Sequence, residues 1–348
     1  MISLGYLSMN ANDERHYATE LAKHSAAYNI EVFHFTPLSI DPHTEKVKGE
    51  KFDPKSETWV SCTFDIPTFI YDRCYFGRDS DSIRSKPIVE WLKKRPDIFF
   101  LGKDIPSKSE LHMKLRTHPL LSSYTLETMR VATIDDLLEA LRIQNCFVLV
   151  PDNSNEEQNT YIITKEKNSV RILHHAVQEK LEILTITNKA ALIKWAETLL
   201  RSQAYVCQPP LFQESGDRKP VILQVLLQKN DAEKWIEKEK VIQTEEDEIQ
   251  LTHWLRKIGA MQRVLIQDGV DTILSVLPEY LDKEFGPLFQ LHLRVGIMKN
   301  GAVWILDVSS KPDHYAVFDD APQEKNTFYQ SLLQYCLLLS KEVGTYYS

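Results

Sequence analysis

Residues 290–312 read QLHLRVGIMKNGAVWILDVSSKP, and this stretch predicts two strands joined by a tight turn. Apolar residues alternate along the first strand, Asn300-Gly301 is a typical hairpin turn, and residues 303–308 form an apolar return strand. Asp307 stands near the end of the return strand, and Ser309 follows two residues later. Because side chains in a strand alternate, both point to one face, and a carboxylate with a second oxygen is one way to build a metal site on a hairpin.

Composition limits the classes of protein to which the chain can belong. Its 348 residues are 43% hydrophobic and 26% charged, enough to bury a large core in two or more subdomains. The net charge is −8 and no basic stretch is concentrated, which argues against a general nucleic-acid binder. Five cysteines without CxxC or CxH spacing indicate reduced thiols in a cytoplasmic-type protein. We expect neither a signal peptide nor a membrane span, because no apolar run has the required length or flanks.

The first hundred residues predict a parallel sheet. Residues 2–7 and 30–35 have the pattern of strands, and a helix between them is predicted to be capped at Asn12-Asp13. Residues 40–59 are polar and predict a loop or a small hairpin. A short buried strand then ends in Tyr71, Asp72 and Arg73, and side chains at this end of a doubly wound sheet line the binding crevice. The alternative is a local contact between Asp72 and Arg73 at the strand end.

Helices and antiparallel strands follow in the rest of the chain. Local signals predict four helix starts, at Pro87, Lys108, Thr133 and Asn188. Residues 161–187 predict an antiparallel meander, and the apolar repeat of residues 251–265 predicts one core helix. A last helix over residues 327–342, capped by Asn326, has an apolar stripe that we expect to be part of the core.

Several of these segments resemble the YheC/YheD family of spore-coat-associated proteins. Residues 67–73 match the family segment P-x-x-x-Y-[DN]-R, and the final hairpin matches the family pattern at Gly296, Trp304, Val308, Lys311 and Pro312. Further matches are Lys108, His112, Gln208 and the strand end Gln228-Lys229-Asn230. The resemblance spans about residues 1–315 and implies the ATP-grasp fold, α/β in its N-terminal part and α+β beyond it.

The resemblance also implies a division into domains. Residues 1–104 correspond to an N-terminal, parallel-sheet pre-ATP-grasp domain. Residues 105–348 correspond to an ATP-grasp-like domain with two α+β subdomains, at about residues 105–205 and 206–348. In an active member of this fold, Mg–ATP binds between the two subdomains, and the metal ions neutralise charge between the phosphates.

By the same resemblance, only part of a nucleotide site is kept. Lys108 stands where a family lysine reaches the nucleotide phosphates, Gln208 stands near the nucleotide, and Lys311 belongs to the final motif. Asp307 is the remaining metal-binding carboxylate. Arg294 and Ser309 replace the other family ligands, an acid and an asparagine.

At other positions, uncharged residues replace the charged residues of the family. Val150 stands in place of a phosphate-binding lysine, and Gln224 in place of an arginine. The loop over residues 152–157 has no glycine and carries two glutamates, whose carboxylates repel polyphosphate. A divalent ion about 4 Å from Arg294 would be repelled by about 8 kcal/mol at an effective dielectric constant of about 20. We hypothesise that Arg294 instead pairs with Asp307 across the hairpin and holds the fold without a metal.

The altered site favours a degenerate ATP-grasp protein, a pseudoenzyme that acts as a scaffold or binding module. The resemblance implies a setting in endospore formation, with the protein made in the cytoplasm of the mother cell and associated with the developing spore coat. Spore-coat or other proteins would then be its partners, and no cofactor is expected. The alternative is an active ATP-dependent carboxylate–amine ligase with an altered Mg–ATP site. A third hypothesis is nucleotide binding without catalysis.

Overall fold

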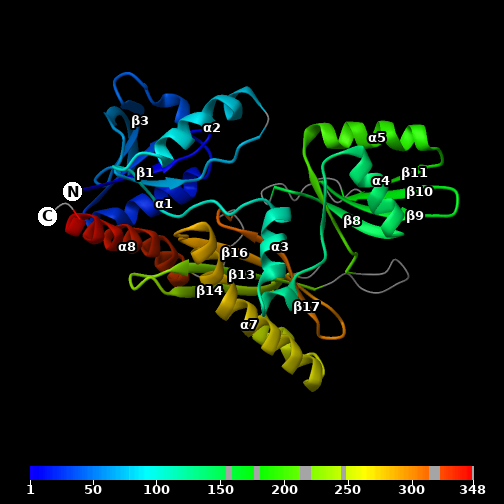
Figure 1. Cartoon of the computed structure of the whole chain (residues 1–348). Helices are drawn as coiled ribbons and strands as arrows, with labels where there is room; N and C mark the ends of the chain where they lie inside the picture. The colour runs from blue at the N-terminus through cyan, green and yellow to red at the C-terminus, as the bar shows by residue number, and fades with distance from the viewer. Residues whose placement is uncertain are drawn as a thin grey trace.

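The protein is described here from a computed structural model, over residues 1–77, 79–153, 159–175, 181–211, 221–243, 248–312 and 322–346. Its fold contains three β-sheets with helices packed against them (Figure 1). The first sheet is mixed and the other two are antiparallel, which confirms the predicted combination of α/β and α+β parts. Within the described residues, no helix is both long enough and apolar enough to cross a membrane.

The first sheet has the strand order β4-β3-β2-β1-β5-β6. Its parallel strands are β1 (Ile2–Leu7), β2 (Ile30–Phe35), β5 (Phe69–Asp72) and β6 (Phe99–Phe100). Where the sequence predicted a loop or a small hairpin, β3 (Lys46–Asp53) and β4 (Thr58–Asp65) form a long hairpin antiparallel to β2.

Helices cover both faces of the first sheet. Leu4 and Tyr6 share a core with α1 (Arg15–Ser25), whereas Leu7 packs with α2 (Ser80–Lys93). Alternate residues of β1 therefore supply two cores, as the two-residue period of a strand requires.

The second sheet has the order β11-β10-β9-β8-β12-β7. Its strands are β7 (Met129–Val131), β8 (Cys146–Pro151), β9 (Thr160–Lys165), β10 (Val170–His175), β11 (Leu181–Ile186) and β12 (Tyr205–Gln208). The meander β9-β10-β11 is confirmed. So are the caps of the two helices that pack on this sheet: Thr133 accepts from the backbone N–H of Asp136 at the start of α4 (Ile134–Ile143), and Asn188 caps α5 (Lys189–Ser202).

The third sheet has the order β15-β14-β13-β16-β17. Its strands are β13 (Val221–Lys229), β14 (Trp235–Gln243), β15 (Glu248–Gln250), β16 (Gln290–Ile297) and β17 (Val303–Ser309). The last two are the predicted hairpin, and Gly301 in its turn has a φ of 92°, a conformation that glycine adopts without strain. Three helices pack on this sheet: α3 (Lys108–Thr117), α6 (Leu251–Leu255) and α7 (Ala260–Phe285).

The last helix, α8 (Pro322–Tyr346), returns to the first sheet. Figure 1 shows it beside α1, with the two chain ends close together. Its buried side chains Phe328, Leu332 and Tyr335 belong to the same core as Leu4 and Tyr6. The core of the N-terminal part is thus completed by the C-terminal end of the chain, so a boundary at residue 104 does not separate two independent cores.

Four helix boundaries differ from the prediction. Helix α1 begins at Arg15, because Glu14 has a left-handed backbone with φ 50°. Helix α2 runs through Pro87 instead of starting after it, because its cap is Asp79, about two helical turns before the proline. The predicted core helix of residues 251–265 is two helices, because α6 ends at Leu255 and α7 begins at Ala260, after its cap Gly259. Helix α8 begins at Pro322, so Asn326 lies inside it.

Short 3₁₀ helices occupy Ala26–Tyr28, Pro37–Ser39 and Leu121–Tyr124. The two glutamates of the predicted acidic loop, Glu156 and Glu157, lie outside the described residues.

Candidate functional site

A buried ion pair stands where the sequence placed a phosphate-binding lysine and a metal ligand. The Nζ of Lys108 lies 2.7 Å from Oδ1 of Asp307, and the two side chains are 8% and 7% exposed. Lys108 begins α3, and Asp307 lies near the end of β17. The pair therefore joins the third sheet to the helix that leads into the second sheet.

The start of α3 is fixed by Asp152, at the end of the second sheet's strand β8. Its carbonyl oxygen accepts from the backbone N–H of Lys108 at 2.8 Å. Its carboxylate accepts from the backbone N–H and the hydroxyl of Ser109, at 2.8 and 2.9 Å. A carboxylate at this position satisfies free N–H groups of the first helical turn and is favoured by the helix dipole. Asp152 thereby holds Lys108 in place.

His112 lies one turn further along α3, on the side that faces the ion pair. It is fully buried, and neither ring nitrogen makes a hydrogen bond of normal geometry with the described residues. Burial, together with the charge of Lys108, lowers the pKa of His112 to about 4. The ring is therefore neutral near pH 7 and adds no charge to the site.

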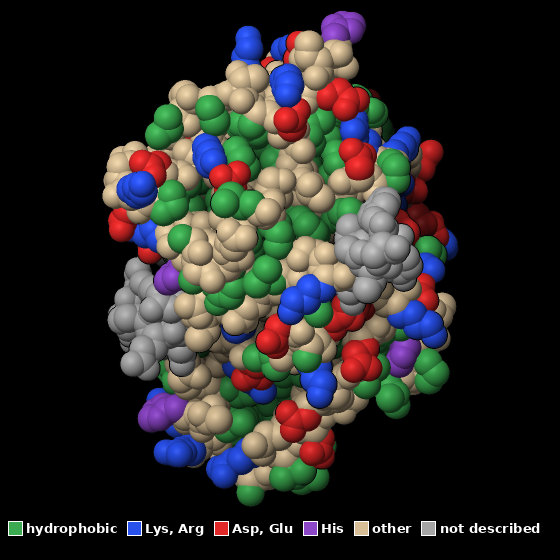
Figure 2. Space-filling view, turned by 90° about the vertical axis from the view of Figure 1, so that its left-hand side faces the viewer, with side chains coloured by type: hydrophobic (Ala, Val, Ile, Leu, Met, Phe, Trp, Pro, Cys, Tyr) green, Lys and Arg blue, Asp and Glu red, His purple; other side chains and the backbone are tan. Residues whose placement is uncertain are grey.

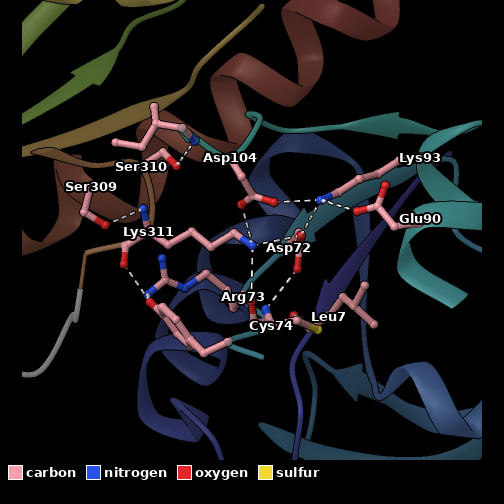
Figure 3. A network of polar contacts seen from close by, with 12 residues as sticks. Leu7, Asp72, Arg73, Cys74, Glu90, Lys93, Asp104, Ser309, Ser310 and Lys311 are labelled. Atoms are coloured by element: carbon pink, nitrogen blue, oxygen red, sulfur yellow. Dashed lines mark hydrogen bonds and ion pairs between the residues drawn. The ribbon is translucent and has the colours of Figure 1, made fainter. Parts of the chain in front are cut away.

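Lys311 lies at the centre of a second cluster, the Lys311 cluster, which consists of Asp72, Lys93, Asp104 and Lys311 (Figure 3). Its Nζ lies 2.9 Å from Oδ2 of Asp72 and 2.6 Å from Oδ1 of Asp104. Lys93 approaches the same two carboxylates, at 3.5 and 2.6 Å. Burial lowers the pKa of Lys311, but the two carboxylates outweigh burial and raise it above its usual value. Two cations and two anions thus neutralise one another where four segments of the chain meet.

Arg73 and Tyr71 bind the final hairpin from the first sheet. The guanidinium of Arg73 donates to both carboxylate oxygens of Glu14, at 2.7 and 2.6 Å, and to the carbonyl oxygen of Pro312 at 2.5 Å. The hydroxyl of Tyr71 donates to Oε1 of Gln290 at 3.0 Å. The three predicted crevice residues, Tyr71, Asp72 and Arg73, are all buried. They join the first sheet to the hairpin, and Asp72 and Arg73 have separate partners.

A polar cavity of about 270 Å³ lies beside the Lys311 cluster. It opens between the first sheet, the start of α3 and the end of the final hairpin. The polar residues that line it include Lys86, Asp104, Ser107, Asn153, Ser309 and Ser310. Ser309, which stands where the family has a metal-binding asparagine, therefore faces a hollow that a small polar ligand can enter.

The other family positions carry uncharged contacts. Val150 on β8 pairs in register with Val206 on β12. Gln224 on β13 hydrogen bonds to His292 at 3.0 Å and to Gln243 at 3.0 Å. Gln208 is buried at the end of β12, and its Nε2 has no hydrogen-bond partner among the described residues.

The hypothesis of a pair between Arg294 and Asp307 is wrong in its choice of partner. The two residues are opposite each other in the register of β16 and β17. The carboxylate of Asp307 nevertheless makes its ion pair with Lys108, and no ion pair between Asp307 and Arg294 occurs within the described residues. Lys108 supplies the cation that the hypothesis assigned to Arg294.

Sequence reasoning missed Glu14, Lys93, Asp104 and Asp152. These residues come from four separate segments, and each stands in a stretch of ordinary polar composition. Only the fold brings them to Arg73, Lys311 and Lys108, so no local pattern could have singled them out.

Comparison with known proteins agrees with this architecture. The family model described as YheC/D like ATP-grasp matches residues 97–339. The endospore coat-associated protein YheC of Bacillus subtilis (strain 168) is 31% identical over 354 residues, which cover 98% of this chain and 97% of that protein.

Solved structures share the fold at low identity. The D-alanine–D-alanine ligase of Coxiella burnetii has a TM-score of 0.53 at 9% identity, with 99% of both chains covered. A RiPP-associated ATP-grasp ligase of Chryseobacterium gregarium, in complex with ADP and a leader and core peptide, has a TM-score of 0.51 at 11% identity, with 98% and 97% covered. The family match and the full-length relative together show that the chain belongs to the YheC/D-like ATP-grasp family.

Proposed function

We propose that this protein is a spore-coat-associated scaffold or binding module that has kept the ATP-grasp fold and lost ligase catalysis. The name of the Bacillus subtilis relative supports the association with the endospore coat. The observation that carries the loss of catalysis is the buried pair of Lys108 and Asp307, at 2.7 Å. This contact occupies both groups that would otherwise bind a phosphate and a metal ion.

The energetic argument follows from burial. If Lys108 turned to a phosphate, Asp307 would remain as a buried carboxylate without its cation. Removing one partner of a buried ion pair typically costs about 3–5 kcal/mol. A charged hydrogen bond to phosphate returns about 1.5–3 kcal/mol, so the exchange is unfavourable unless a metal ion takes the place of Lys108.

The surroundings of Asp307 provide few further ligands for a metal ion. Ser309 lacks the carboxylate or amide oxygen of a typical ligand, and the register partner of Asp307 is the cation Arg294. These features support a site that is neutralised by the chain itself.

The Lys311 cluster supports the scaffold role. It is an ion-pair network in which Lys311, at the end of the final hairpin, joins residues 72, 93 and 104. Buried and partly buried networks of this kind fix the geometry of the segments that they connect. The polar cavity beside the cluster remains available for a small ligand in a binding module.

Thermal unfolding with and without millimolar Mg–ATP tests the proposal. Ligand at about 100 times its dissociation constant stabilises a folded protein by about 2.7 kcal/mol. For a chain of 348 residues that unfolds as one unit, this corresponds to an increase of about 4 °C in Tm. We expect no increase, and we expect the same result with ATP alone and with Mg²⁺ alone.

An increase of that size with Mg–ATP, but with neither component alone, would contradict the proposal. It would favour the alternative, an active ATP-dependent carboxylate–amine ligase with an altered site. Release of ADP in the presence of candidate carboxylates and amines would then distinguish catalysis from binding.

A further inference from the structure

The first turns of α7 expose a row of apolar side chains, the α7 stripe, which consists of Met261, Val264 and Leu265. These side chains are 80%, 55% and 47% exposed. Their spacing of three and four residues places them on one side of the helix. Large apolar residues gathered on one exposed helix face are typical of an interaction surface.

The α7 stripe belongs to a well-anchored part of the molecule. The opposite side of the helix, with Ile266, Val270 and Ile273, is buried against the third sheet. Gln262 donates from Nε2 to the carbonyl oxygen of Lys299 at 2.6 Å, which ties the start of α7 to the turn of the final hairpin. In Figure 1 this end of α7 extends to the lower edge of the molecule. The stripe is thus rigid and accessible before any partner binds.

Charges of opposite sign lie at the two ends of the stripe. Arg256 and Lys257 precede it, and Asp268 and Asp271 follow it, seven residues after Met261 and Val264. All four side chains are exposed, and none forms an ion pair among the described salt bridges. In Figure 2 the lower end of the molecule shows hydrophobic side chains, with positive charges on one side of them and negative charges on the other.

We propose that the α7 stripe is the contact surface of a symmetric dimer in which two α7 helices cross antiparallel. A two-fold axis through the middle of the stripe brings the α7 stripe of one protomer into contact with the α7 stripe of the other. At a rise of about 1.5 Å per residue, Asp268 and Asp271 lie about 8 and 12 Å along α7 beyond that axis, and Arg256 and Lys257 lie on its other side, in the turn between α6 and α7.

The charge pattern is what selects a second copy as the partner. In the antiparallel arrangement, the basic end of each helix meets the acidic end of the other, so both ends attract. A partner of one sign would be attracted at one end of the stripe and repelled at the other. The stripe is short, so we expect a weak dimer that forms at about 10–100 μM chain.

Charge reversal on the full-length protein tests this arrangement. One variant carries Arg256→Glu and Lys257→Glu, which makes both ends of the surface acidic. The other carries Asp268→Lys and Asp271→Lys, which makes both ends basic. We expect each variant alone to sediment as a monomer of about 40 kDa, as the chain mass of 40.3 kDa requires. We expect an equimolar mixture of the two to recover a species of twice that mass, because opposite charges then meet at both ends.

A matched control carries Asp231→Lys and Glu233→Lys, two exposed acids in the turn between β13 and β14. It should dimerise like the unaltered protein. The Tm of each variant should match that of the unaltered protein within about 2 °C, which excludes misfolding as the cause of dissociation.

Two results would overturn the dimer. One is an unaltered protein that stays monomeric up to about 300 μM, well above the expected range. The other is a dimer that persists in both reversed variants, which would place the contact elsewhere on the molecule.

Discussion

Lys108 and Asp307 show how one residue can take over the role of a bound ion. A buried carboxylate needs a positive charge beside it, because an isolated ion in a protein interior is strongly disfavoured. In a metal site that charge comes from solution. Here it comes from the Nζ of Lys108, 2.7 Å away, and it is present whenever the chain is folded.

We therefore expect Lys108→Met to lower the free energy of unfolding by about 3–5 kcal/mol, because Asp307 is then buried without a cation. Adding Asp307→Leu should recover most of this loss, since the double variant leaves no charge unpaired. Urea unfolding of the three proteins measures the coupling between the two residues.

Lys46 and Asp65 provide a matched surface pair, with side chains 49% and 83% exposed. Lys46→Met should cost less than about 1 kcal/mol, because water screens an exposed pair. If Lys108→Met cost no more than this control, the buried pair would have no special importance for stability.

At the residue scale, the sequence singled out several residues that the fold brings into ion pairs, and it missed the partners in those pairs. Lys108, Asp307, Lys311 and Asp72 were all predicted as site residues. Lys108 is 199 positions from Asp307, and Asp72 is 239 positions from Lys311. Pairing at such separations depends on the fold, so no local pattern indicated it. The family resemblance implied a nucleotide and metal site for Lys108, Asp307 and Lys311, and Asp72 was predicted to line the crevice of the first sheet.

Helix α7 is the element in which packing most clearly overrides local preference. Gly269 lies in the middle of this helix, where alanine is intrinsically favoured by about 1 kcal/mol. A Cβ at this position would lie 2.5 Å from Cγ2 of Val303 and 3.3 Å from the ring of Tyr124. The glycine thus allows the helix to approach β17 closely.

We expect Gly269→Ala to lower the free energy of unfolding by about 1–2 kcal/mol. This is the cost of the steric clash with β17 minus the gain in helix propensity from alanine. Adding Val303→Ala should reduce the effect of the new Cβ. Gln267→Ala, an exposed change in the same helix, should stay within about 0.5 kcal/mol of the unaltered protein. A stabilising Gly269→Ala in chemical unfolding would show that the helix can move away from β17.

Among the elements, the sequence was most successful where the signal is local. Thr133 and Asn188 begin helices as predicted, because a cap needs only its own first turn. The start of α1 was predicted too early. Glu14 takes a left-handed backbone there, and its carboxylate binds the distant Arg73. Such a boundary is set by a contact across the fold and is invisible to a pattern of neighbouring residues.

The whole molecule is closed by α8, which packs on the first sheet. Phe328 lies 5.6 Å from Tyr17 of α1, measured between ring centroids. Leu332 is fully buried in the same core. The stability of the first sheet therefore depends on the last helix.

We expect Leu332→Ala to lower the free energy of unfolding by about 2–5 kcal/mol and to speed amide hydrogen exchange in β1 and β2. Leu192→Ala in α5 is the control, because that side chain belongs to the core of the second sheet. It should speed exchange in the second sheet and leave β1 unchanged. Faster exchange confined to α8 after Leu332→Ala would contradict the shared core.

At this scale, the family resemblance predicted the ATP-grasp fold and its N-terminal parallel sheet. It did not predict where α8 packs, because an apolar stripe shows that a helix is buried and not which sheet buries it. From the sequence pattern alone, the apolar stripe with Phe328 and Leu332 could pack on the third sheet or on the first sheet.

The packing of α8 on the first sheet has a consequence for folding during synthesis on the ribosome. Synthesis makes β1 and α1 long before α8. Before α8 has been made, the core around Leu4 and Tyr6 contains α1 but lacks Phe328, Leu332 and Tyr335. We expect a chain that stops before α8 to expose part of this apolar core and to aggregate more readily than the whole chain. The core of the first sheet is therefore begun when β1 is made and is completed only after α8 has been made.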